Sequence, residues 1–288
     1  MPREINVKKD DVLVGITVDR FRGIAPSVLL VLIRRIGLEF IEITKSVFDD
    51  LSSFVENLGT IQTGFHLPNL YDAEFDFSFQ ERETEIQKLT RLINQHHREL
   101  NITYCLSHPP ENRKSSLTVD QLITYLLENL NQLNVPIILE NIQSWDVTKF
   151  DRFYDRAKQV LGNKLIGQCF DAPHYFLQGE DPVEYLKQRD GKINFIHLSD
   201  CRRGYDAHLP FGLNGELPIN DILAILKQQN FQGIINLELL PRKVTDIKPL
   251  INSYLKVIHN FDRMKFLKTK IKLILYAPPL MRKLKHVF

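Results

Sequence analysis

The chain has 288 residues and lacks any long apolar segment. Its longest apolar runs, such as Val28–Ile33 and Ile271–Leu275, fall far short of the roughly 20 residues that a helix needs to cross a bilayer. Residues Met1–Asp11 mix charged and apolar side chains without an apolar core, so we expect no signal peptide. Both absences argue against a membrane-spanning or secreted protein.

Cysteine is scarce. Cys105, Cys169 and Cys201 are an odd number without CxxC spacing, which argues against a disulfide framework. The GxGxxG and GxxxxGK(S/T) loops that hold nucleotide phosphates are also absent. The sequence therefore predicts a protein of a reducing, cytoplasmic compartment.

Acidic residues are missing from residues 263–288, which contain eight Lys and Arg. Positions 1–262 then hold 29 basic and 35 acidic residues, a net charge of −6, although the whole chain carries +2. A nucleic-acid partner requires a concentrated basic surface. Nucleic acid is therefore the weaker candidate partner for the body of the chain.

Short apolar runs alternate with longer amphipathic stretches throughout residues 12–260. Such alternation indicates parallel strands with right-handed helical crossovers, and eight pairs favour closure into a barrel. The expected strands are Val12–Val18, Glu39–Thr44, Ile61–His66, Ile102–Ser107, Pro136–Glu140, Leu165–Asp171, Ile193–Leu198 and Ile234–Leu239. The expected helices are Pro26–Ile36, Phe48–Asn57, Phe79–Leu100, Thr118–Leu133, Val147–Leu161, Pro182–Gln188, Ile219–Gln229 and Val244–Asn260.

The fold class predicted is α/β, a single (β/α)₈ barrel over residues 1–262 with a basic amphipathic extension over residues 263–288. An open doubly wound sheet is the competing architecture. The extension mixes basic and apolar residues around a break expected at Pro278-Pro279. We expect a terminal arm that docks on the barrel or on another subunit; a peripheral membrane contact and a nucleic-acid contact are the alternatives.

Polar groups able to bind a metal follow six successive expected strands. They are His66, His108, Glu140, Asp171 with His174, His197 with Asp206 and His208, and Glu238. A barrel gathers the carboxyl ends of its strands at one mouth, where these groups would repel and desolvate one another without positive charge. A divalent cation supplies that charge. Mixed carboxylate and imidazole ligation favours zinc or manganese, with magnesium, iron and cobalt as alternatives.

Two further carboxylates lie outside this set of candidate ligands. Glu42, in the second expected strand, either faces the mouth or makes a structural hydrogen bond. Asp200 is expected to orient His197 or to bind an arginine rather than to ligate a metal.

Several segments resemble the xylose isomerase-like TIM barrels, the superfamily that includes endonuclease IV. The resemblance spans Val12 to Phe261 and rests on Phe65-His66, His108-Pro109, Leu139-Glu140-Asn141, Phe170–His174, His197–Asp200, Asp206–Pro210 and Leu237-Glu238. It implies a sugar or sugar-phosphate isomerase or epimerase, often a homo-oligomer. In such relatives one metal, held at Glu140, Asp171, His197 and Glu238, stabilises an enediolate formed by proton transfer.

The same resemblance assigns roles to single residues. Glu140 and Glu238 would act as base and acid. His174 and Arg202 would orient substrate hydroxyls, and His66 and His108 would line the pocket.

The alternative implied by the resemblance is phosphodiester hydrolysis of the endonuclease IV type, with up to three ions. All nine ligand types of that enzyme have a match, the additional ones being His66, His108, His174, Asp206 and His208. The acidic body argues against it, as does Asn69, which stands where endonuclease IV is expected to have an aromatic residue. The loop after His208 also departs from the family pattern: two residues separate Gly212 and Gly215, where the family usually has one. A metal-binding barrel without turnover is the third alternative.

Overall fold

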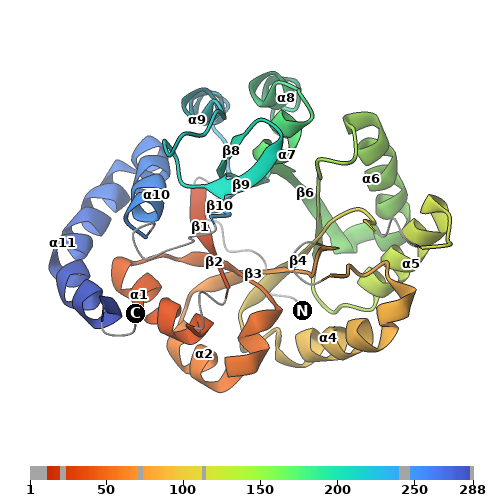
Figure 1. Ribbon diagram of the computed structural model, residues 1–288, viewed down its shortest axis with the longest axis horizontal. Coiled ribbons are helices and arrows are strands. Elements are labelled where there is room, and N and C mark those ends of the chain that lie inside the picture. The colour runs from red at the N-terminus through yellow and green to blue at the C-terminus, as the bar shows by residue number, and fades with distance from the viewer. Residues whose placement is uncertain (1–11, 20–23, 71–73, 112–114, 240–246, 286–288) are drawn as a thin grey trace.

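Eight parallel strands close into a barrel in the order β1-β10-β7-β6-β5-β4-β3-β2. The computed structural model describes residues 12–19, 24–70, 74–111, 115–239 and 247–285. The strands lie at the centre of Figure 1, and helices surround them. Their bounds are β1 Val12–Val18, β2 Phe40–Ile43, β3 Gln62–His66, β4 Ile102–Ser107, β5 Ile137–Glu140, β6 Leu165–Asp171, β7 Phe195–His197 and β10 Gly233–Leu237. The predicted barrel is confirmed; the segment Met1–Asp11 lies outside the described residues.

The outer helices follow the strands in turn, and the termini of several are set by local sequence. Their bounds are α1 Pro26–Ile36, α2 Leu51–Leu58, α4 Glu83–His96, α5 Val119–Asn131, α6 Val147–Leu161, α8 Pro182–Gln188, α9 Ile219–Gln228 and α10 Ile247–Phe261. Thr118 and Gln121 form a capping box at the start of α5. The Asp181 carboxylate accepts backbone N–H groups at the start of α8, where Pro182 occupies the first turn.

Two expected helices begin differently in the structure. The 3₁₀ turns Lys45–Asp50 and Gln80–Arg82 precede α2 and α4, so these α-helices start later than the apolar periodicity indicates. Residues 244–246 of the last expected helix lie outside the described residues.

Inside the barrel, an apolar layer supports a polar mouth. The layer consists of Leu13, Phe40, Tyr104, Leu106, Ile138, Cys169, Phe195 and Ile234. Because side chains two residues apart on a strand share a face, the next inward position after Phe40 is Glu42. By the same step, Glu140 follows Ile138 and His197 follows Phe195. The strand period therefore places these polar groups directly above the packed interior.

Three elements were not predicted from the sequence. Helix α7, Ala172–Leu177, follows β6 directly. Strands β8, Asp200–Arg202, and β9, Tyr205–Leu209, form an antiparallel hairpin after β7. In Figure 1 this hairpin lies beside α7, inside the ring of helices. It carries two of the candidate site residues, Asp206 and His208.

The basic extension forms helix α11, Arg263–Lys285, which packs against α1 and α10 at the periphery of the barrel (Figure 1). The break expected at Pro278-Pro279 is wrong, because the helix continues through both residues. An internal proline removes a backbone donor and kinks a helix, but it does not have to end it. Within the described residues, no helix is both long and apolar enough to span a bilayer.

A stability prediction follows from the close approach of β3 and β4. A Cβ at Gly64 would lie 2.4 Å from Cζ of Tyr104, whose ring is buried and packs against Phe40 and Phe195. We expect Gly64→Ala to lower the free energy of unfolding in urea by about 1–3 kcal/mol. In a Tyr104→Leu background the same change should cost much less, and an equal cost in both backgrounds would contradict the steric explanation.

Candidate metal centre

Four candidate ligands converge where β5, β6, β7 and β10 end. Glu140, Asp171 and His197 are the last residues of their strands, and Glu238 follows β10. One ligand atom from each of the four lies within 4.8 Å of all the others. Glu140, Asp171 and His197 are buried, and the side chain of Glu238 is 13% exposed. The structure thus brings the predicted four-residue set to one point.

Three buried polar atoms of Glu140 and His197 have no hydrogen-bond partner among the described residues. His197 Nδ1 lies 3.1 Å from Glu140 Oε2 and 3.2 Å from Glu238 Oε2. Among the described residues, neither Glu140 oxygen has a hydrogen-bond partner, nor does His197 Nδ1. Buried acceptors without donors are costly. Carboxylate oxygens and one imidazole nitrogen suit zinc or manganese, so the donor set fits a divalent cation.

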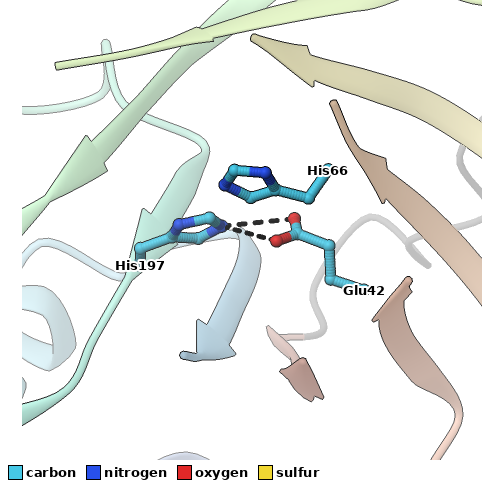
Figure 2. Close-up of side chains that lie close together, drawn as sticks. All are labelled: Glu42, His66 and His197. Atoms are coloured by element: carbon cyan, nitrogen blue, oxygen red, sulfur yellow. Dashed lines mark hydrogen bonds and ion pairs between the residues drawn. The ribbon is translucent and has the colours of Figure 1, made fainter. Parts of the chain in front are cut away.

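Both oxygens of Glu42 face one ring nitrogen of His197, as Figure 2 shows. His197 Nε2 lies 3.2 Å from both Glu42 oxygens. Glu42 also accepts hydrogen bonds from the Tyr104 hydroxyl at 3.0 Å and the Asn236 amide at 3.3 Å. A proton on Nε2 leaves the Nδ1 lone pair directed at the centre, the arrangement by which carboxylates orient metal-binding histidines. Glu42 is therefore a positioning residue.

Among the described residues, Asp200 neither contacts His197 nor pairs with an arginine, so these two expected contacts are wrong. Asp200 accepts backbone N–H groups from Cys201 and Leu217 through Oδ1, and from Gly212 through Oδ2. It thereby fixes the loop after the β8–β9 hairpin, because three backbone donors occupy its oxygens. Glu42, rather than Asp200, is the carboxylate that lies beside His197.

Asn141 fixes the backbone of Asp171, a function that the sequence did not reveal. The amide of Asn141 accepts the Asp171 N–H at 2.9 Å and donates to the Asp171 carbonyl at 3.0 Å. Asp171 Oδ1 in turn accepts the His174 N–H at 2.6 Å, as the N-cap of α7. Asp171 thus ends a strand, begins a helix and faces the centre.

His66 and His108 form a second group with Glu140. The Nε2 atoms of His66 and His108 lie 3.9 Å and 3.4 Å from Glu140 Oε2. In the described part of the chain, His66 Nε2 and both ring nitrogens of His108 have no hydrogen-bond partner. Glu111, which the sequence did not single out, lies with Oε2 3.7 Å from His108 Nδ1. Its loop position after Pro109-Pro110 gave no signal.

Asp206 links the two remaining candidate histidines. Its Oδ2 lies 3.1 Å from His174 Nε2 and 3.3 Å from His208 Nε2. The hairpin brings His208 back toward Glu238, and the His208 Nδ1 lies 3.2 Å from the Glu238 carbonyl oxygen. Arg202 does not join this group: its side chain is exposed, and its Nε donates to the Asn214 carbonyl. The position of Arg202 gives its predicted role no support.

The sequence of residues 30–258 matches the family described as xylose isomerase-like TIM barrel, and this span covers most of the chain. The chain belongs to this family. No curated protein in the comparison matches this xylose isomerase-like chain significantly.

Solved structures with the same fold have diverse names. A D-tagatose 3-epimerase-like protein is 18% identical, with a TM-score of 0.61 over 85% of this chain and 98% of its own. An AP endonuclease of family 2 from Brucella melitensis is 13% identical, with a TM-score of 0.63 over 82% and 95%. The 3-keto-D-glucoside 4-epimerase of E. coli is 12% identical, with a TM-score of 0.61 over 86% and 100%. At these identities the likeness concerns the fold alone.

Electrostatics in this xylose isomerase-like barrel reflect crowded carboxylates. Burial raises the pKa of Asp171 to about 7; Glu140 and Glu238 add to the rise and His174 opposes it. Burial alone would raise the pKa of Glu140, but His197 and His108 outweigh it, so the pKa falls well below its usual range. Burial lowers the pKa of His174, but Asp171 and Asp206 overcome this and bring it to about 10. Without a cation, protons balance the charge of the centre.

We expect cation affinity to depend on pH. Asp171, with a pKa of about 7, must lose its proton to become a ligand. Protons therefore compete with the cation at Asp171 below pH 7 and also at His197, whose pKa is raised well above its usual value by nearby carboxylates and Cys169 against the effect of burial. The dissociation constant for Mn²⁺ should rise at least about tenfold per pH unit lost. Titration calorimetry on chelator-treated protein at pH 6, 7 and 8 measures this, and an unchanged constant would contradict it. Asp171→Asn should weaken binding at pH 8 and make the pH dependence shallower, because the proton of His197 must still be displaced.

The positioning role of Glu42 yields a second prediction. Glu42→Gln should weaken Mn²⁺ binding about 10- to 100-fold, because the neutral amide no longer fixes the tautomer of His197. Glu39→Gln is the matched control, since Glu39 precedes the same strand and its side chain is 63% exposed. Calorimetry of the two variants checks this. Equal affinities would show that Glu42 does not act on the centre.

Proposed function

We propose that this chain is a metal-dependent isomerase or epimerase that moves a proton on a carbon next to a carbonyl of a sugar or sugar phosphate. One observation carries the proposal. Glu140 and Glu238 come from strands separated in the barrel by β6 and β7, yet their Oε2 atoms both lie within 3.2 Å of His197 Nδ1. Two carboxylates therefore face one point from different sides.

In this reaction Glu140 and Glu238 act as the base and the acid. His197 and His108 keep Glu140 ionised despite its burial, and His208 and His197 likewise lower the pKa of Glu238. One carboxylate removes the substrate proton. The other takes a proton from solvent and delivers it to the opposite face or to the neighbouring carbon, and the first carboxylate then releases its proton to solvent. A bound divalent cation would supply Lewis-acid polarisation of the substrate carbonyl. Glu140, Asp171, His197 and Glu238 would hold it, with Asn141 and Glu42 fixing two of these ligands.

The apolar layer inside the barrel affects the electrostatics of the metal centre next to it. The apolar layer below Glu140 and His197 excludes water from the floor of the centre. Such exclusion strengthens the electrostatic effect of every charged group there. The mouth therefore favours reactions in which charge develops on a substrate oxygen.

Phosphodiester hydrolysis is the second candidate, because the other five predicted groups also converge. His66 and His108 share Glu140, and His174 and His208 share Asp206. Three adjacent groupings of ligands can hold more than one ion, which suits activation of water and stabilisation of a leaving oxygen. The net charge of −6 over residues 1–262 opposes binding of a nucleic acid.

Variants of the two carboxylates test the proposal. Wild-type protein with Mn²⁺, given D-tagatose and D-allulose in deuterium oxide, should incorporate deuterium next to the carbonyl, measured by NMR. Glu140→Gln and Glu238→Gln should each slow this exchange by about 10²- to 10⁴-fold, since each removes an acid–base group. Glu216→Gln, on the loop after the hairpin and with a half-exposed side chain, is the matched control.

Other outcomes favour the alternatives. A bound stoichiometry of three ions, together with nicking of a duplex that contains an abasic site, would replace the isomerase by the hydrolase. Tight metal binding without exchange on ketoses, aldoses or their phosphates, and without nicking, would indicate a barrel that binds metal but has no turnover.

A further inference from the structure

Helix α11 carries a continuous apolar stripe that faces solvent. Met264, Leu267, Ile271, Ile274 and Leu275 are between 51% and 72% exposed. At about 100° per residue these five positions fall within an arc of about 100°. Exposed apolar residues scattered singly are ordinary, but a contiguous stripe marks an interaction surface.

The opposite face of α11 is already bound to the barrel. Thr269 is buried, and the Phe266 ring lies 4.7 Å from the His259 ring of α10. Lys265 Nζ lies 2.7 Å from Glu39 Oε2 at the start of β2. Because this contact fixes the rotation of the helix, α11 cannot turn its apolar stripe inward while it stays docked.

Basic side chains flank the stripe on both sides. On the helical wheel Lys268 and Lys272 border one edge, and Arg263 and Lys270 border the other. Within the described part of the chain these four residues form no ion pair with a carboxylate, and residues 263–288 contain no Asp or Glu. Long basic side chains beside an apolar stripe can keep their charges at a polar interface while their stems cover apolar surface.

We propose that α11 binds the protein peripherally to an anionic lipid surface, with the apolar stripe inserted between headgroups and the basic flanks on lipid phosphates. An amphipathic helix lying in the interface binds through apolar area and attraction to anionic lipids together. A second copy fits less well. A two-fold contact through the same stripe would bring the basic flanks of both copies together, and α11 offers no acidic partner for them.

Vesicle flotation of the full-length protein tests the proposal. It should float with vesicles of phosphatidylcholine containing about 30% phosphatidylserine, stay in solution with phosphatidylcholine alone, and detach as salt screens the charges. Ile271→Glu with Ile274→Glu should lower the partition coefficient at least tenfold, on the order of the effect of two lost apolar insertions. Lys268→Glu with Lys270→Glu should do the same at low salt.

Controls separate loss of binding from loss of folding. Val160→Glu places the same substitution at a 47% exposed apolar residue of α6 and should leave flotation unchanged. The α11 variants change exposed positions, so their thermal unfolding and Mn²⁺ affinity should match the wild type. Failure to float with anionic vesicles, or equal flotation with neutral ones, would overturn the proposal. So would a dimer in sedimentation that Ile271→Glu dissociates, because the stripe would then belong to a subunit interface.

Discussion

Glu140 sets the main physical constraint on the mouth of this barrel. It is fully buried, and in the described structure neither of its oxygens has a hydrogen bond, while His66, His108 and His197 surround it. A buried carboxylate needs positive charge, because transfer from water without compensation is costly. Without a cation, protonated His108 and His197 supply the positive charge. Burial alone would lower their pKa values, but Glu140 and other nearby groups raise both well above the usual value. A divalent cation and the protons on these histidines therefore compete to neutralise Glu140.

The strands were predictable because parallel strands covered on both faces read as short apolar runs. Three of them, β1, β4 and β6, have the predicted bounds, and so do α1, α6 and α8. The missed elements have different causes. Helix α7 has only six residues and begins where Asp171 caps it. The β8–β9 hairpin is pinned by Asp200, whose bonds to Gly212 and Leu217 join residues far apart in the loop.

The candidate ligands could be found from sequence because barrel topology brings all strand ends to one side. The contacts that position these ligands within the site could not be found from sequence. Glu42 is a positioning residue since it lies below His197, a relation between strands two and seven that no local pattern records. Asn141 and Glu111 act through backbone and imidazole contacts formed only after folding. The resemblance implied a substrate-orienting role for Arg202, but its side chain is exposed and donates to the Asn214 carbonyl.

Burial ranks the three groupings of ligands, and this ranking bears on the chemistry. The side chains of His174, Asp206 and His208 are 13–21% exposed, and Asp206 Oδ2 lies within 3.3 Å of both histidines, which offset its charge. Glu140 and His197 are at most 1% exposed and have no such access. The need for a cation is therefore greatest beside Glu140 and His197, where Asp171 and Glu238 also converge, and smaller at Asp206. A mouth that binds one ion tightly and leaves its outer histidines free to contact substrate hydroxyls suits proton transfer on a sugar. Hydrolysis requires the outer groups, which are the more exposed ones, to hold ions of their own.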